Sequence, residues 1–532
     1  MMGLKMKRHI ADLFSRLPSD KRVVKLTRFL DDKSLEVLPQ TGDKTFGIGG
    51  VDEPFYLALL SMISIDVRKK VPSRGSVAIT RSISSYVGVG LKGLILRSGI
   101  VNWLKSIQLS RVYYRPVGKV GYRSSSFIYP LADLYDFYKA YQLWRNLQSS
   151  EDISKLVVDD ILVGDLVIDS YLRFRPSPFF EVKDKFVLKI LWQVYRDIRR
   201  ATNFFLKSEP SFYLSSLTTY VEHGVPVRCA LNIGVPVYLV SSSLVFGKKL
   251  SDDDYFHSPN SSGYRPGFEA LESKADKLQM AEEKLEFRLS GGIDDATNYM
   301  RTSAYASSNE QLPDVDGAVI IFLHDFYDSP HVYDEFIFPD FWSWISFTID
   351  TLIKSETLFW IKPHPNQIPR SEEALQLLLR KYPHLKMLSM HITNSQLVNG
   401  GITCGVTAYG TVAHELAYMG VPSICCAKHP HHSFDFCRTA KDINEYQSFL
   451  QSPDVLTLSK NDMQYQALAF YYMHNFSEDP DTIALRHQFN NLAREVQNME
   501  STRMLEELSK FQELPAYNNF IEVLVRDLTN AQ

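Results

Sequence analysis

The chain has 532 residues, 45% of them hydrophobic, which is too long for one ordinary core and predicts a soluble protein of two large domains. Its five cysteines are odd in number and show no C-x-x-C spacing, which argues against a disulfide framework and a structural zinc site and favours a reducing compartment. The net charge of -3 conceals an asymmetry, because residues 1–150 carry 24 Lys and Arg against 11 Asp and Glu, a net of +13, and the remainder carries -16 (-3 − 13).

The N-terminal extension, 1–43, lacks the apolar core of a signal peptide, and no apolar run approaches the ~20 residues of a membrane span. We therefore expect a cytoplasmic protein, either free or peripheral at the inner membrane. No acidic residue occurs between Asp66 and Asp133, so the basic segment 68–123 favours an anionic partner: a lipid headgroup, a lipid-linked phosphate or an acidic glycan. A solvated basic surface is the alternative. We expect no nucleic acid, since no RNP-type, zinc-finger or helix-turn-helix signal is present.

Residues 44–246 alternate short apolar runs with longer amphipathic stretches, which is typical of βα units and a mainly parallel sheet. Strands are expected within the apolar runs 44–50, 75–80, 108–114, 155–168, 212–220 and 235–242. Amphipathic helices are expected over 131–147 and 185–206. This part of the chain is predicted to be the acceptor-side Rossmann-like domain.

A polar segment, 247–313, follows as a linker or interdomain insertion and contains a charged helix over 269–289. A second α/β series occupies 314–477. Its strands are expected within 317–326, 357–365, 385–390, 401–406 and 422–427, and its helices within 340–355, 371–382, 411–420 and after Met463. The tail, 478–532, is helical and is expected to pack back across the domains. The predicted fold is α/β, with two Rossmann-like domains facing across a cleft and a helical C-terminal tail.

In open α/β sheets ligands bind beyond the carboxyl ends of the strands, and one apolar strand of the second domain ends in a polar turn. Lys362, His364 and Pro365 lie in this turn. Its two prolines stiffen the backbone, so that the cation and the imidazole can both point at a diphosphate. A proline turn with a capped histidine is the structural alternative.

A second polar turn precedes the helix expected over 411–420. Residues of this turn and of the first helical turn are candidates for binding the donor nucleotide: Thr407, Tyr409, Gly410, Thr411 and Glu415. Free N–H groups at a helix N-terminus favour phosphate, and the carboxylate one turn later would accept ribose hydroxyls. A purely structural turn with hydroxyl caps is the alternative.

The Lys-Pro-His-Pro element, followed by the Thr/Gly turn and a glutamate-bearing helix that ends in Gly-x-Pro, resembles the donor half of GT-B glycosyltransferases of bacterial surface polysaccharides. The resemblance is nearest to capsule and lipopolysaccharide enzymes that use CMP-activated acidic sugars, Kdo- or sialyltransferase-like, and extends in pattern to CDP-glycerol glycerophosphotransferases. It implies that His364 and Pro365 hold the donor phosphate together with Thr407 and Thr411. It covers residues 317–475 and implies a metal-independent GT-B fold enzyme without a cofactor.

The segment after the first strand of the second domain contains two histidines and two carboxylates, but their spacing matches no standard zinc pattern. We interpret it as an interdomain loop in which His324, Asp325 and His331 approach the donor or the acceptor. A later loop with Lys428, His429, His431 and His432 is likewise interpreted as contacting substrate rather than metal. We expect no metal ion in the protein.

The catalytic base is expected on the first domain, and two places qualify. One is Glu222 and His223, where a helix opens; their pattern is similar to the acidic-acidic-glycine motif of bacterial sialyltransferases, with histidine in place of the second acid. The other is Asp160 or Asp165, within a cluster of charged residues on an apolar stretch: Asp159, Asp160, Asp165, Asp169 and Arg173. Burial or a like-charged neighbour would raise the pKa of such a carboxyl group toward the working pH. Turn and cap carboxylates are the alternative for both.

The sequence thus predicts a glycosyltransferase that moves a sugar from a nucleotide donor, CMP-linked for preference, to a glycan or glycolipid acceptor. Two alternatives keep the fold: a CDP-glycerol or CDP-ribitol phosphotransferase and a UDP-sugar epimerase. A third is an inactive scaffold at the membrane surface.

Overall fold

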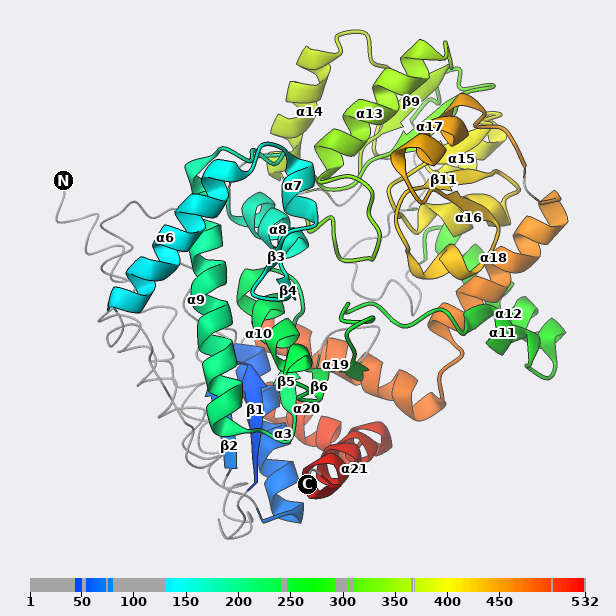
Figure 1. Ribbon diagram of the computed structural model, residues 1–532. Coiled ribbons are helices and arrows are strands. Elements are labelled where there is room, and N and C mark those ends of the chain that lie inside the picture. Colours follow the sequence, from blue (N-terminus) through cyan, green and yellow to red (C-terminus); the bar gives the residue numbers. More distant parts are fainter. Residues whose placement is uncertain are drawn as a thin grey trace.

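The structure is a computed structural model of the chain (Figure 1). It describes residues 44–49, 54–72, 75–79, 130–175, 177–240, 246–292, 305, 310–364, 367, 369–456, 458–498 and 501–530. The strand expected over 108–114, the N-terminal extension and most of the basic segment 68–123 lie outside the described residues.

The first domain is built on a five-stranded sheet in the order β2-β1-β5-β6-β7. Its strands are β1 (Thr45–Gly49), β2 (Gly75–Ile79), β5 (Tyr213–Ser215), β6 (Val237–Val240) and β7 (Phe246–Leu250). All neighbours are parallel except the edge strand β7, which pairs antiparallel with β6 and extends this sheet into the segment predicted as a linker.

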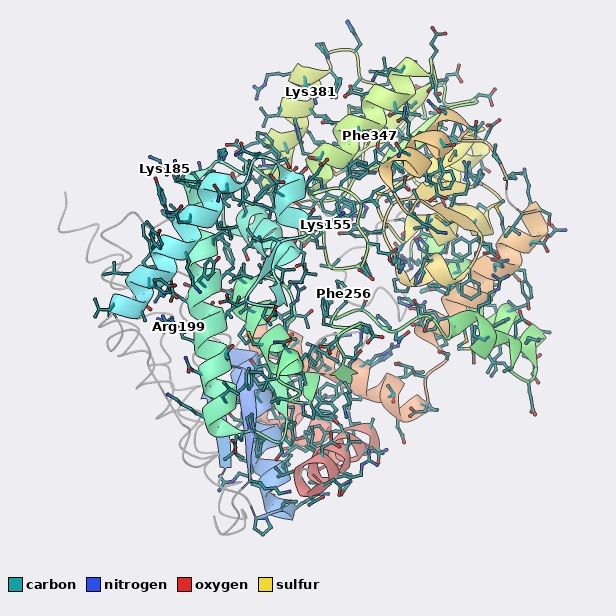
Figure 2. The ribbon with its side chains drawn as sticks, viewed as in Figure 1. Lys155, Lys185, Arg199, Phe256, Phe347 and Lys381 are labelled. Carbon is teal, nitrogen blue, oxygen red and sulfur yellow. The ribbon has the colours of Figure 1, made fainter. Side chains whose placement is uncertain are left out.

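Helices cover both faces of this sheet, as parallel strands require. The helices of this domain are α3 (Pro54–Lys70), α6 (Pro130–Asn146), α7 (Ser150–Ser154), α8 (Gly164–Phe174), α9 (Lys185–Ser208) and α10 (Val221–Asn232). Side chains alternate along the strands, so Tyr238 faces the core beneath α3, while Val237 and Leu239 face the core beneath α8, α9 and α10. Helix α6 is joined to α9 by Arg199, which is labelled in Figure 2. Its guanidinium donates to Asp133 and Asp136, each at 2.6 Å.

The second domain contains five strands, all parallel, in the order β12-β11-β10-β8-β9. They are β8 (Val319–Phe322), β9 (Phe359–Lys362), β10 (Cys404–Val406), β11 (Ser423–Cys425) and β12 (Cys437–Thr439). Its helices are α13 (Phe341–Lys354), α14 (Pro369–Lys381), α15 (Asn394–Asn399), α16 (Val412–Tyr418), the 3-10 helix η3 (Pro430–Ser433), α17 (Ile443–Gln451) and α18 (Lys460–Asn475). One core lies beneath α13, α14 and α17, and others lie toward α15, α16 and α18.

Helices α11 (Tyr264–Glu269) and α12 (Lys274–Leu289), from the polar segment after β7, pack on α18 of the second domain. The chain then returns to the first domain through α19 (Pro480–Asn498), α20 (Ser501–Glu513) and α21 (Pro515–Asn530). Phe489, Phe511 and Phe520 from these helices share one core with α3 and the first sheet, and α21 lies beside α3 (Figure 1). The predicted fold class, two Rossmann-like domains with a helical C-terminal tail, is confirmed.

Some predicted strands are wrong. The stretch 155–168 forms a two-stranded hairpin, β3 (Val157–Val158) and β4 (Ile161–Leu162), and then the start of α8. The strand expected over 212–220 ends at Ser215, and 385–390 contributes only an isolated bridge between Met387 and Ile361. Strand β12 was not predicted. Within the described residues, no helix is both long enough and apolar enough to cross a membrane.

Candidate functional site

The second sheet reverses its strand order between β8 and β10, which lie side by side although β9 comes between them in the chain. In doubly wound sheets such a switch point opens a crevice at the carboxyl ends of the strands, where ligands bind. His324 follows β8, and Thr407 follows β10. Lys362 is the last residue of β9, and His364 comes two residues later. The tertiary structure therefore gathers three separately predicted elements at one edge of the sheet.

His324 is fixed at this switch point. Its Nε2 lies 3.0 Å from Thr407 Oγ1 and accepts from the backbone N–H of Tyr409 at 3.5 Å. Its ring stacks on Phe341, with centroids 4.9 Å apart, and lies 4.6 Å from the ring of Tyr409. Burial and the nearby charge of His364 lower the pKa of His324 to about 3, so its imidazole is neutral at physiological pH.

The Thr/Gly turn is held by its own hydrogen bonds. Thr407 Oγ1 accepts from the Gly410 N–H at 3.1 Å, and a Cβ at Gly410 would lie 2.7 Å from that oxygen, so glycine keeps the turn tight. Tyr409 is buried and donates its hydroxyl to the carbonyl of Ser329 at 3.2 Å. Thr411, by contrast, is exposed at the start of α16, and its side chain makes no capping bond. Of the predicted hydroxyl pair, Thr411 is therefore the more accessible.

Lys362 ends β9 and is buried, with 6% of its surface exposed. Within the described part of the chain, no hydrogen-bond acceptor or carboxylate pairs with its ammonium group. Burial lowers the pKa of Lys362 to about 8, against the opposing charge of Glu415. Burial also lowers the pKa of the neighbouring His364, and the charge of Lys362 adds to this effect. Pro365 lies outside the described residues.

Glu415 is completely buried in α16. Its Oε1 accepts from Tyr305 at 2.6 Å and lies 3.1 Å from an Nη2 of Arg288, while its Oε2 accepts from Asn394 at 2.8 Å. Both oxygens are thus held by protein groups, and the role of Glu415 in binding ribose stays a prediction. Arg288 and Tyr305 were not identified from the sequence, because they come from the segment interpreted as a linker.

The loop from β8 to α13 reaches the first domain. His331 Nδ1 lies 2.7 Å from Asp169 Oδ1 of α8, and Ser329 donates to the hydroxyl of Tyr220 at 2.8 Å. Burial lowers the pKa of His331, but the carboxylate of Asp169 outweighs burial and raises it above its usual value. Asp325 accepts from the Tyr327 N–H at 2.9 Å and from Ser371 at 2.8 Å. These contacts join the loop to the first domain, and the approach of His324, Asp325 and His331 to a donor or an acceptor stays a prediction.

The four predicted bases occupy different environments. Asp165 is paired with Arg228, and the closer of the two guanidinium nitrogens lies 2.5 Å away. Burial raises the pKa of Asp165, but the charge and the hydrogen bonds of Arg228, with smaller contributions from His331 and a backbone N–H, lower it below its usual value. Glu222 and His223 are buried in the first turn of α10, with the Oε1 and Nε2 atoms 3.9 Å apart. Asp160 is exposed in the β3–β4 turn. The catalytic roles of these four residues stay predictions.

The sequence identified Asp169 only as a member of a charged cluster and not as a partner of His331. It lies four residues after Asp165 in α8, so both carboxylates project from one face of this helix. Because we interpreted 155–168 as a strand, we missed the helical repeat of 3.6 residues per turn that places the two carboxylates together.

Comparisons with known proteins show little similarity. No protein-family model matches the chain, and no curated protein matches it. Among solved structures, UDP-GlcNAc 2-epimerase from Neisseria meningitidis bound to UDP-GlcNAc is 11% identical, covers 91% of this chain and 99% of its own, and has a TM-score of 0.20. S. aureus MnaA in a co-structure with UDP is 11% identical, covers 86% of this chain and 97% of its own, and has a TM-score of 0.22. Overlaps this weak assign no function, and the fold rests on the strand order of the two sheets.

Proposed function

We propose that this chain is an enzyme that binds a nucleotide-activated sugar at the switch point of its second domain and transfers the sugar to an acceptor hydroxyl. The observation that carries the proposal is Lys362, a buried lysine at the carboxyl end of β9. Its ammonium lies 5.9 Å from the centroid of the Phe322 ring and forms no hydrogen bond or ion pair with a residue that the structure describes. A buried cation that forms no direct ion pair is costly, and an anionic ligand would offset that cost. A diphosphate or phosphate-linked sugar in the switch-point crevice supplies such an anion.

The groups next to Lys362 are suited to stabilising the phosphate of a departing nucleotide. His364 follows Lys362 by two residues, and the hydroxyl of Thr411 is exposed at the start of α16. Donors of this kind stabilise negative charge on a leaving phosphate. The preference for a CMP-linked acidic sugar, and a place in capsule or lipopolysaccharide synthesis, come only from the resemblance of the sequence motifs.

His331 is our candidate for the base that deprotonates the acceptor. Its Nδ1 is engaged by Asp169, which fixes the ring and leaves Nε2 for a substrate proton. This arrangement supports His331 ahead of Asp165, whose carboxylate is paired with Arg228.

Lys362→Met tests the donor site. We expect the affinity for the preferred nucleotide, among CMP, CDP, UDP and GDP, to fall by about tenfold to a hundredfold, because a charge-assisted hydrogen bond contributes roughly 1.5–3 kcal/mol. Calorimetric titration measures it, with Lys354→Met, an exposed lysine at the end of α13, as the matched control. Equal affinities in the two variants would refute the site.

His331→Gln tests the chemistry. Loss of a general base should lower the rate of nucleotide release about 10²- to 10⁴-fold while donor affinity stays within a few-fold. The exposed His391→Gln is the control.

Conversion of the donor to its epimer without any acceptor would favour the UDP-sugar epimerase, and transfer of a polyol phosphate would favour the phosphotransferase. Nucleotide binding without turnover, together with salt-sensitive binding to anionic vesicles, would favour the inactive scaffold.

A further inference from the structure

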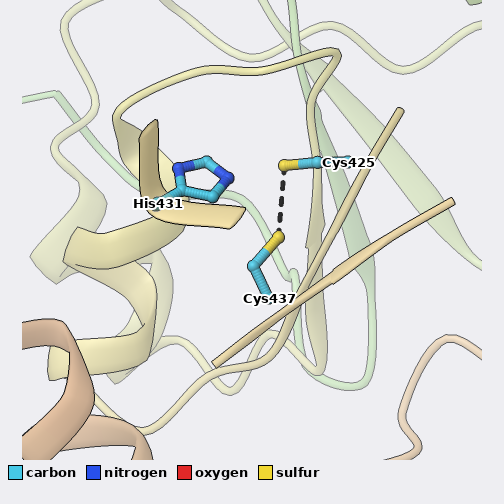
Figure 3. A group of neighbouring side chains, drawn as sticks. All are labelled: Cys425, His431 and Cys437. Atoms are coloured by element: carbon cyan, nitrogen blue, oxygen red, sulfur yellow. Dashed lines mark hydrogen bonds between the residues drawn. The ribbon is translucent and has the colours of Figure 1, made fainter. Parts of the chain in front are cut away.

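Three side chains of the second domain bring two thiols and an imidazole together. Cys425 ends β11, His431 lies in η3, and Cys437 begins β12. One ligand atom from each lies within 4.8 Å of those of the other two, and the two sulfur atoms are 3.2 Å apart. The imidazole points toward the sulfurs (Figure 3).

The three side chains are buried, and the ring nitrogens of His431 are buried with them. Cys425 and His431 have no exposed surface and Cys437 has 7%. Neither ring nitrogen of His431 has a hydrogen-bond partner among the residues that the structure describes. A neutral imidazole carries one donor and one acceptor, and burying both unsatisfied costs free energy. A metal ion held together with the two thiols would satisfy one of these ring nitrogens.

Strand register and a helix cap position the three side chains. In the parallel pairing of β11 with β12, Cys437 lies opposite Ser423, so Cys425, two residues after Ser423, projects from the same face of the sheet. His429 caps η3 by accepting from the N–H of His431, which fixes the position of that histidine. Cys426 projects to the opposite face, where it belongs to the core beneath α13.

We propose that Cys425, His431 and Cys437 bind one Zn²⁺ ion or a chemically similar thiophilic divalent cation. Two thiolates and a neutral imidazole are ligands that zinc prefers, and the fourth tetrahedral position is filled from outside the trio. Binding releases the two thiol protons to solvent and forms two metal–sulfur bonds and one metal–nitrogen bond. Zn–S bonds of about 2.3 Å place tetrahedral sulfurs roughly 3.8 Å apart, so the pair opens slightly on binding.

The ion would brace one wall of the candidate site. The segment between β11 and β12 contacts the β8–α13 loop. The rings of His429 and Tyr333 lie 4.9 Å apart, and the backbone N–H of Lys428 donates to the carbonyl of Asp334 at 2.9 Å. The ligand spacing, C-x5-H-x5-C, is not a zinc-finger pattern, which is why the sequence led us to expect no metal. The proposal is independent of the nucleotide chemistry.

The test uses the full chain purified with its thiols reduced and dialysed against Zn²⁺ or Co²⁺. We expect one ion per chain by elemental analysis and a thiolate-to-cobalt charge-transfer absorption. Cys425→Ala and Cys437→Ala should abolish that absorption, and His431→Gln should weaken binding at least tenfold. Cys426→Ala, a neighbouring buried thiol on the other face, should leave binding unchanged.

Wild-type protein that binds neither ion while its thiols are reduced would overturn the proposal, whatever the folding of the variants. Mass spectrometry of peptides from protein isolated without oxidant provides a second test. A disulfide between Cys425 and Cys437 in that protein would also overturn the proposal. Unchanged cobalt absorption in Cys425→Ala, with its circular dichroism intact, would also do so.

Discussion

His324 combines a structural and an electrostatic role at the switch point of the second sheet. Its Nε2 accepts from the Tyr409 N–H, so the proton of its neutral ring lies on Nδ1. This arrangement joins the end of β8 to the turn after β10 and explains why the ring must remain uncharged.

The lowered pKa of His324 makes the free energy of unfolding depend on pH. The unfolded chain has the usual histidine pKa of about 6.5, whereas the folded value is about 3. Between these values the unfolded state binds a proton that the folded state does not, so stability falls as the pH drops from about 6.5 to about 3.

We therefore expect His324→Gln to lose less stability than the wild type on acidification. Between pH 8 and pH 5 the difference should reach about 2 kcal/mol, measured by urea unfolding at both pH values. His391→Gln, an exposed histidine, is the control. An identical acid loss in wild type and His324→Gln would show that His324 is protonated in the folded state.

Among the elements, the hairpin and helix at 157–174 show how one apolar run can be misassigned. Asp159 and Asp160 adopt positive φ angles of 47° and 64°, which match a two-residue hairpin turn of type I′. Gly164 then begins α8, whose buried residues include Leu166, Val167 and Ile168. A helix buried on most sides carries almost continuous apolar residues, so periodicity could not separate it from a strand.

The C-terminal helices are structural parts of the first domain, and Phe511 is their most informative residue. It is fully buried and its ring lies 5.5 Å from that of Phe246 at the start of β7. Phe511→Ala should lower the free energy of unfolding by about 3–5 kcal/mol, because it opens a cavity in that core. Urea unfolding measures this, and Leu206→Ala, 58% exposed on α9, should change stability by less than about 0.5 kcal/mol. Similar values for the two would contradict the packing of α20 on the first domain.

At the scale of the whole molecule, Asp340 links the two domains. Its Oδ1 accepts from the Ser343 N–H at 2.6 Å and caps α13, while its Oδ2 accepts from the backbone N–H of Phe180 in the first domain at 2.7 Å. The rings of Phe179 and Trp342 lie 5.6 Å apart beside it. One buried carboxylate thus serves both a helix and the interface.

Asp340→Ala should cost about 2–4 kcal/mol, since it removes a cap and leaves a buried N–H without its acceptor. Hydrogen exchange should accelerate at the amide of Phe180. Asp442→Ala is the matched control: Asp442 caps α17 through the N–H groups of Asn444 and Glu445, so its loss should cost only about 1 kcal/mol and leave Phe180 unchanged. Protection of Phe180 that survives Asp340→Ala would rule out this link.

The amino-acid sequence by itself determined the fold class and four of the five strands of the second domain, β8, β9, β10 and β11. It also singled out the strand end at Lys362, whose role stays a prediction. These are local properties: apolar periodicity, proline positions and the residues that follow a strand. The strand order was decided only by the tertiary structure, and with it the neighbours of each residue. It placed His324 against Thr407 and Asp169 against His331, and it gathered Cys425, His431 and Cys437. Each of these groups joins residues from different elements, and their proximity depends on sheet pairing and domain contacts, which no local pattern encodes.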